Sequence, residues 1–161
     1  MALKLIHIPQ VKPEFRVLGV TACKETYGFL VIGAVFRGNR ELDGVLSGKG
    51  DSIEEIIVRI LIESKHLGQV RLILLDQISL PVQVDPVKIW EKTGKPVLVI
   101  SEERTLDSRY MFMYQDKVFL AAGIDEESTK RVLKVIYPDS RSEALRIAGI
   151  ILKSILGLHN V

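Results

Sequence analysis

Two aspartates are the residues in this sequence whose type and position best suit metal chemistry. Asp76 closes the apolar run VRLILLD, and Asp43 lies in an earlier extended segment. A carboxylate at the carboxyl end of a buried parallel strand lies where open α/β sheets bind their ligands. Together with Glu54 or Glu55, the pair would form an all-oxygen site of the kind that magnesium or manganese prefers. The alternative is that Asp76 caps a turn and Asp43 faces solvent or forms an ion pair.

Hydrophobic patterning predicts the elements that must position these side chains. Runs of apolar residues predict strands, and the S-x-x-E, Asp-Pro and terminal Gly signals predict where helices begin and end. The predicted strands are Arg16–Val20, Tyr27–Phe36, Arg40–Ser47, Val70–Asp76 and Pro96–Ile100, followed by a short hairpin around Gln115-Asp116. The predicted helices follow Ser52, Asp85, Asp125 and Ser140, and the first of them ends near Gly68.

This order predicts an α/β fold with a ribonuclease H-like mixed sheet, in which an antiparallel three-strand start precedes parallel strands. A dinucleotide-binding fold would open with a strand, a G-x-G-x-x-G turn and a helix, and no such turn is present. With 161 residues and no linker of low complexity, we expect a single domain over residues 1–161.

Composition limits the class of protein. The chain is 47% hydrophobic and 26% charged, with a net charge of +2, which is typical of globular proteins and too mild to indicate nucleic acid by itself. No apolar run has the length of a membrane span or a signal peptide, so we expect a cytoplasmic protein without a membrane partner. Cys23 is the single cysteine, which excludes an internal disulfide and favours a small buried apolar residue.

Three further features have weaker implications. GVLSGKGDS (44–52) is similar to a phosphate-binding loop, but Gly50 stands where the Ser or Thr hydroxyl would hold magnesium. His66 precedes the Val70–Asp76 strand, so we expect a structural role opposite the proposed cleft. Basic residues gather in the last third of the chain, either as a face for phosphates or as the solvated side of two helices; they include Lys130, Arg131, Lys134, Arg141 and Arg146.

Several stretches together are similar to the archaeal endonuclease dU family, which is related to endonuclease V. The stretches include KPEFRVLGV, FLVIGAVFRG, LDGVLS, KHLGQVRLILLD and TGKPVLVI, and the similarity runs from Lys12 to Ile151. The resemblance implies the ribonuclease H-like fold and a nuclease in which carboxylates bind divalent metal, on the first strand, near the third strand or following helix, and at the end of the fourth. Endonuclease V acts beside deaminated bases, and the family's name implies activity on deoxyuridine.

The chain departs from this family pattern at two places. Where the family reads G-I-D-D-G, the chain has Gly19-Val20-Thr21-Ala22-Cys23, so Thr21 and Ala22 stand at the first-strand carboxylate positions. After Asp76, the chain has QISLPVQVDP in place of the family's glycine-containing loop. Loss of both the central anionic ligand and this loop is what we expect after loss of catalysis.

Three functions remain open from the sequence. The first is a catalytically degenerate relative of endonuclease V that retains nucleic-acid binding. The second is an active endonuclease for deaminated DNA, dependent on magnesium or manganese and using Asp43, Asp76 and Glu55; no other cofactor is indicated. The third is a non-catalytic interaction module in which the apolar strand YMFMY (110–114) forms a homo-oligomer.

Overall fold

A seven-stranded mixed sheet forms the centre of the molecule. The computed structural model describes residues 5–101 and 111–159. Across the sheet the strands lie in the order β3-β2-β1-β4-β5-β7-β6. Their bounds are β1 Arg16–Glu25, β2 Gly28–Arg37, β3 Glu41–Gly50, β4 Leu72–Asp76, β5 Val97–Ser101, β6 Met111–Tyr114 and β7 Lys117–Ala122. The first three strands are antiparallel, whereas β4 is parallel to β1 and β5 is parallel to β4. The predicted mixed sheet with an antiparallel three-strand start is therefore confirmed.

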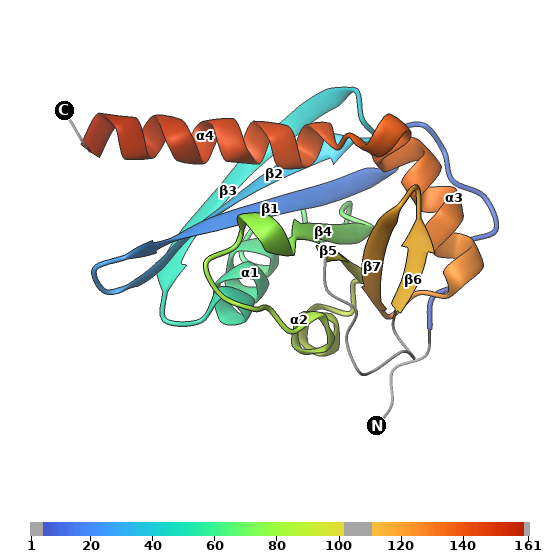
Figure 1. Cartoon of the computed structure of the whole chain (residues 1–161), viewed down its shortest axis with the longest axis horizontal. Coiled ribbons are helices and arrows are strands. Elements are labelled where there is room, and N and C mark those ends of the chain that lie inside the picture. Colours follow the sequence, from blue (N-terminus) through green and yellow to red (C-terminus); the bar gives the residue numbers. More distant parts are fainter. Residues whose placement is uncertain (1–4, 102–110, 160–161) are drawn as a thin grey trace.

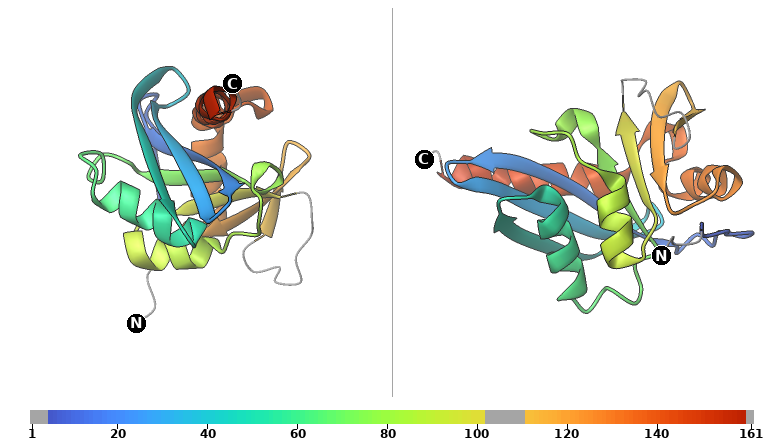
Figure 2. Two further views of the ribbon diagram at one scale, coloured as in Figure 1. Left: turned by 90° about the vertical axis from the view of Figure 1, so that its left-hand side faces the viewer. Right: turned by 90° about the horizontal axis from the view of Figure 1, so that it is seen from below.

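Helices cover both faces of this sheet. They are α1 Ile53–Ile62, α2 Pro86–Thr93, α3 Glu126–Ile136 and α4 Glu143–His159. Figure 1 shows α4 running across β1 and β2. The view from below in Figure 2 shows α1 and α2 on the opposite face. The apolar core accordingly has two parts, one between the sheet and the α1/α2 layer and the other between the sheet and the α3/α4 layer.

The alternation of side chains along β1 divides its residues between these two layers. Leu18, Val20 and Ala22 belong to the core beneath α1 and α2, and Val17 belongs to the core beneath α4. Thr21 has the same parity as Val17 and therefore faces the α3/α4 layer. The two positions where the family resemblance places carboxylates thus point to opposite faces of the sheet.

Gly19 brings α4 close to β1. A Cβ atom at Gly19 would lie 2.6 Å from the Cβ of Ala144, so no larger residue fits between this strand and the first turn of α4. Ala148, one turn further along the helix, is fully buried in the same core. Small residues on both elements therefore allow α4 to pack directly against β1 next to Thr21.

Several element boundaries differ from those that the pattern predicts. β1 continues five residues beyond Val20 because β2 pairs with it as far as Gly28. The first helix ends at Ile62, well before Gly68. The helix α4 is capped by Ser142, whose hydroxyl accepts from the N–H of Leu145 at 3.1 Å, and the predicted Ser140 cap is wrong because Ser140 has a positive φ of 58°.

Candidate functional site

Thr21 and Asp76 form the centre of the candidate site. The parallel pairing of β1 with β4 runs from Val17 opposite Leu72 to Val20 opposite Leu75, so Thr21 and Asp76 are the next positions on the two strands. Leu72 and Leu74 belong to the core beneath the α3/α4 layer, and by alternation Asp76 faces that layer too. Thr21 is 5% exposed. The structure therefore places this hydroxyl beside the fourth-strand aspartate, where the family resemblance places a carboxylate.

Asp76 also shapes the chain that follows it. One of its carboxylate oxygens accepts from the N–H of Ile78 at 3.1 Å and so caps η1 (Gln77–Ser79), a short 3-10 helix. The turn-capping role that the sequence left open is thus part of what Asp76 does. Gln77 fixes the loop further, since its side chain donates to the carbonyl of Val82 and accepts from the N–H of Val84.

Tyr137 lies near enough to this site to feel the charge of Asp76, which the sequence pattern does not indicate. Burial and, after it, the negative charge of Asp76 raise the pKa of the Tyr137 phenol. The side chain lies in the core beneath α3 and α4, 5% exposed, with its ring edge-on to Phe119. Tyr137 follows the last residue of α3, and no local pattern connects it to a strand 61 positions earlier. Only the packing of α3 against the sheet brings them together.

Asp43 lies far from this site, so the expected shared cleft of Asp43 and Asp76 is wrong. Asp43 accepts from Arg16 Nε and Arg37 Nε, each at 2.8 Å. Arg16 begins β1, five residues before Thr21, which corresponds to about 16 Å along the strand. Arg16 also shares its strand face with Leu18, on the α1 side. An antiparallel hairpin places the start of β3 at this end of the sheet, whereas Asp76 lies at the other end.

The electrostatics of Asp43 match those of a structural ion pair. Burial alone would raise its pKa, but the hydrogen bonds and charges of Arg16 and Arg37 outweigh burial and hold the pKa of Asp43 below its ordinary value. Both carboxylate oxygens are already occupied by guanidinium groups. The ion-paired alternative for Asp43 is therefore the one that the structure shows.

The two glutamates of α1 have local roles. The N–H of Glu55 donates to the hydroxyl of Ser52 at 3.3 Å, which confirms the predicted capping position, and the Glu55 side chain is exposed. Glu54 accepts from the N–H of Asp85 at 3.0 Å and so joins the start of α1 to the start of α2. Both glutamates belong to α1, which covers the face of the sheet opposite to the one that Asp76 faces.

The side chains around Asp76 do not fit a paired-metal centre. Within residues 5–101 and 111–159, no group of three or more His, Cys, Asp or Glu side chains is arranged to hold a metal ion. Thr21 supplies one neutral oxygen, and Ala22 supplies none and faces the other layer. Burial, aided by Glu25, raises the pKa of the nearby Cys23 thiol, which disfavours the thiolate that would bind a metal.

The basic residues of the last third fall into two groups. Lys130, Arg131 and Arg146 are each paired with a glutamate of their own helix, namely Glu126, Glu127 and Glu143. Lys134 and Arg141 are exposed and have no carboxylate partner among the described residues. These two flank the segment that carries Tyr137, so they are the cations of this set that are free to meet an anion near Asp76.

Two other sequence features are also placed by the fold. Lys49 of the loop-like GVLSGKGDS segment lies within β3 and pairs with Glu25 at 3.3 Å, so this segment is no phosphate-binding loop. His66 lies at the end of the sheet opposite Asp76, as predicted, and its carbonyl accepts from the N–H groups of Gln69 and Val70. Its imidazole packs on Gly44, where a Cβ would lie 2.5 Å from Nε2.

The apolar strand proposed for oligomerisation is partly used within the core. The ring of Phe112 stacks on Phe119 with centroids 5.6 Å apart, and Tyr114 meets the same ring edge-on. Met113 on the other side of β6 is 51% exposed. Tyr110 lies outside the described residues. Core packing therefore accounts for the two aromatic residues that the structure describes in this strand.

Archaeal relatives define the family of this chain. A UPF0215 protein of Methanopyrus kandleri is 30% identical over 172 residues, covering 94% of this chain and 86% of the relative. A UPF0215 protein of Methanothermobacter thermautotrophicus is 39% identical over 101 residues. This match spans about half of the relative, covering 50% of its length. No protein-family model matches the chain. The chain belongs to the UPF0215 family.

Solved structures show the fold class. An Archaeoglobus fulgidus protein of unknown function has a TM-score of 0.73 at 18% identity, covering 88% of this chain and 98% of that one. Endonuclease V of Bacillus subtilis has a TM-score of 0.62 at 9% identity, covering 97% and 87%. Endonuclease V of Ciona intestinalis, in complex with inosine-containing DNA, has a TM-score of 0.64 at 9% identity, covering 88% and 85%. The predicted ribonuclease H-like fold, which endonuclease V shares, is therefore confirmed.

No helix among the described residues has the length and apolar character needed to cross a membrane.

Proposed function

We propose that this protein binds nucleic acid at the carboxyl end of β4, beside Thr21 of β1, and that it does not cleave nucleic acid by the metal-dependent route. The observation that carries the proposal is the placement of Thr21 beside Asp76. A neutral hydroxyl at this position removes the anionic ligand that would organise a divalent ion between the two strands. Asp43 cannot replace it, because its carboxylate is held by two arginines at the other end of the sheet.

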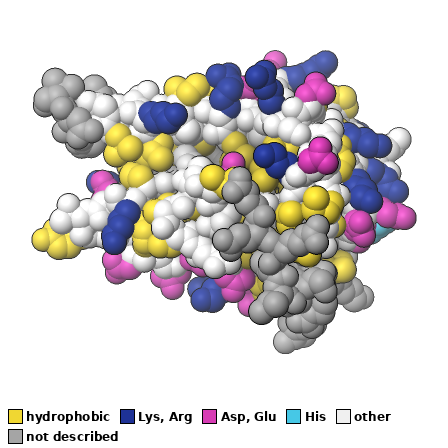
Figure 3. All heavy atoms as spheres, in the orientation of Figure 1, with side chains coloured by type: hydrophobic (Ala, Val, Ile, Leu, Met, Phe, Trp, Pro, Cys, Tyr) yellow, Lys and Arg dark blue, Asp and Glu magenta, His cyan; other side chains and the backbone are white. Residues whose placement is uncertain are grey.

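Binding without cleavage is supported by the surface next to this site. Lys and Arg side chains are spread along α4 and over α3 (Figure 3). Of these, Lys134 and Arg141 have no carboxylate partner among the described residues and flank the segment of Tyr137. Unpaired cations on one surface attract the phosphate backbone with little dependence on base sequence. The Ciona endonuclease V of the same fold was solved on DNA, which is consistent with a nucleic-acid ligand on this architecture.

The binding half of the proposal is tested by fluorescence anisotropy. A labelled duplex containing inosine, and an undamaged duplex of the same length, are titrated at several salt concentrations. We expect binding to weaken as salt is added. Arg141→Gln should reduce the slope of log K against log salt concentration by about one. Lys130→Gln is the matched control, because its ammonium is paired with Glu126. Absence of salt-dependent binding would overturn this half, and sedimentation would then test the oligomeric alternative.

The catalytic half is tested by a gel assay on inosine- and uracil-containing DNA with magnesium or manganese. We expect no cutting above that of a metal-free control. Robust metal-dependent cutting by the wild-type protein would overturn this half, and Asp76→Asn would then show whether the activity depends on the fourth-strand carboxylate.

A further inference from the structure

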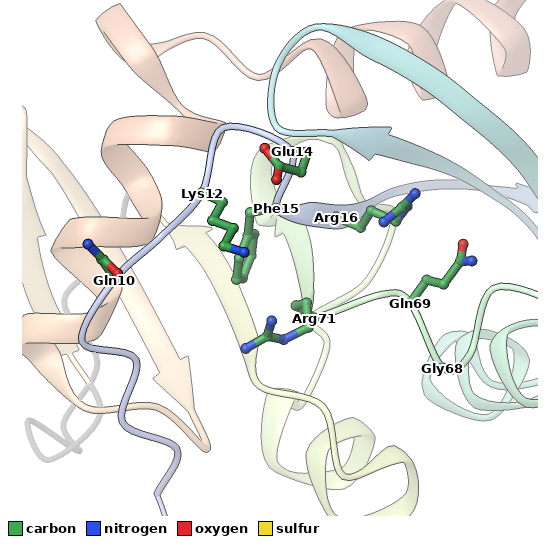
Figure 4. A pocket seen from close by; sticks show the side chains of 8 residues that line it. All are labelled: Gln10, Lys12, Glu14, Phe15, Arg16, Gly68, Gln69 and Arg71. Atoms are coloured by element: carbon green, nitrogen blue, oxygen red, sulfur yellow. The ribbon is translucent and has the colours of Figure 1, made fainter.

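A polar pocket lies at the end of the sheet opposite Asp76, where β1 and β4 begin. Its volume is about 400 Å³, within the range of small-molecule sites. The segment before β1 contributes Lys12, Glu14 and Phe15, and the segment before β4 contributes Gln69 and Arg71 (Figure 4). The N–H of Arg71 donates to the carbonyl of Arg16 at 2.9 Å and joins the two segments. Because it lies at the other end of β4, the pocket is separate from the Thr21/Asp76 site.

The cations of this pocket are only partly balanced. Arg16 is bound to Asp43, whose single negative charge it shares with Arg37. Glu14 is the one carboxylate among the lining residues. Neither Lys12 nor Arg71 forms an ion pair within the part of the chain that the structure describes. The pocket therefore retains a positive charge that no neighbouring described residue satisfies.

A second lysine lies beside Arg71. Ile73 pairs with Val97, and two residues earlier the same parallel register places Arg71 next to Lys95. Burial and, after it, the charge of Arg71 lower the pKa of the Lys95 ammonium. The fold thus holds two cationic side chains close together at a free-energy cost, which a bound anion would relieve.

The Arg71 side chain is held in place without a bound ligand. Its guanidinium lies over the ring of Phe15, 5.5 Å from the centroid. Phe15 is itself anchored in the core, 5% exposed. In Figure 4 the Lys12 side chain extends toward the same ring from the preceding turn. An arginine that is positioned in advance loses less conformational entropy when it binds a ligand.

We propose that the pocket formed by Lys12, Phe15, Gln69 and Arg71 is a second binding site, which takes a phosphate group. A guanidinium fork gives two parallel hydrogen bonds to phosphate oxygens, and a lysine ammonium adds a point charge. The phosphate comes either from a free phosphorylated molecule or from a nucleic-acid backbone, and the two sources are separated by experiment.

Isothermal titration calorimetry at fixed ionic strength tests this site. The probes are pyrophosphate, a nucleoside triphosphate and a short DNA duplex. We expect wild-type protein to bind pyrophosphate with a dissociation constant below about 1 mM, and Arg71→Gln and Lys12→Gln each to weaken binding about tenfold. Lys88→Gln, an exposed lysine on α2, is the control and should bind as wild type. Tighter binding of the triphosphate indicates a free ligand, and loss of duplex binding in both pocket variants indicates backbone phosphate.

Thermal unfolding shows whether a variant that fails to bind is still folded. Since a ligand that binds only the folded state raises Tm, pyrophosphate should raise the Tm of the wild type and of Lys88→Gln, and raise it less in the two pocket variants. Lys12 is exposed and forms no ion pair with any residue that the structure describes, so Lys12→Gln remains informative even if Arg71→Gln destabilises the fold. Absence of pyrophosphate binding in the wild type, or unchanged binding in folded Lys12→Gln and Arg71→Gln, would overturn the proposal.

Discussion

Thr21 and Asp76 occupy neighbouring positions on the parallel strands β1 and β4, and both face the layer formed by α3 and α4. The hydroxyl is buried, and the carboxylate beside it caps η1. Burial and, after it, the charge of this carboxylate raise the pKa of Tyr137. One substitution at Thr21 would therefore place two carboxylates side by side in a region with little solvent. This relationship gives the first prediction.

Thr21→Asp should create manganese affinity while lowering stability in the absence of metal. A second carboxylate next to Asp76 is costly when both are ionised, by on the order of 1–3 kcal/mol, and a divalent cation offsets that repulsion. Calorimetry should show manganese binding that the wild type lacks, and manganese should raise the Tm of the variant.

Ala22→Asp is the matched control for this experiment. Ala22 points into the core beneath α1, so its carboxylate would be buried away from Asp76. We expect a larger loss of stability and no rescue by manganese. Equal manganese responses in the two variants would show that Thr21 does not stand where the family has its metal ligand.

Asp43→Asn should destabilise the protein at neutral pH by about 1–3 kcal/mol, because it removes charge-assisted hydrogen bonds to Arg16 and Arg37. The pKa of Asp43 is lowered by folding, so its contribution is present above the ordinary aspartate pKa of about 3.9 and is lost as pH falls through the folded value. Urea unfolding at pH 7 and at pH 3 should therefore show a smaller difference from wild type at pH 3. A constant difference would contradict the ionic contribution.

Gly44→Ala should destabilise the hairpin side of the sheet by about 1–3 kcal/mol, since the new Cβ would lie 2.5 Å from Nε2 of His66. His66 is buried, and its Nδ1 has no hydrogen-bond partner among the described residues. A double-mutant cycle with His66→Ala measures the conflict directly. Gly44→Ala should lower the free energy of unfolding much less in the His66→Ala background than in the wild type. If the two losses are additive, the clash with His66 is not the cause of the destabilisation.

Asp125→Ala should loosen the N-terminal segment as well as α3. The carboxylate of Asp125 accepts from the N–H of Ser128, which caps α3, and binds His7 Nδ1 at 2.8 Å. Ser128 in turn accepts from the N–H of Ile8. We expect a loss of about 1–2 kcal/mol and faster amide hydrogen exchange at Ile8. Glu126→Ala, next to it on the helix surface, should leave exchange at Ile8 unchanged.

The chain sequence by itself determined the order and type of the elements. Apolar runs such as VRLILLD need burial on both faces, and local caps such as Asp85-Pro86 and Asp125 act within one helical turn, so neither depends on distant residues. The resemblance to the endonuclease dU family also predicts that Thr21 and Ala22 stand at that family's carboxylate positions.

Only the tertiary structure decided which of these side chains meet. Asp43 lies on β3 and Asp76 on β4, which follow one another along the chain but are separated by β2 and β1 in the sheet. The bulge near Val35 leaves Asp43 without a paired residue on β2, and hydrophobic periodicity does not show such a bulge. Tyr137 reaches the Asp76 site, and Arg71 reaches Lys95, through packing between segments far apart in the chain. Such contacts depend on strand register and on the layer that each helix covers, because side chains that alternate along a strand change face with every residue.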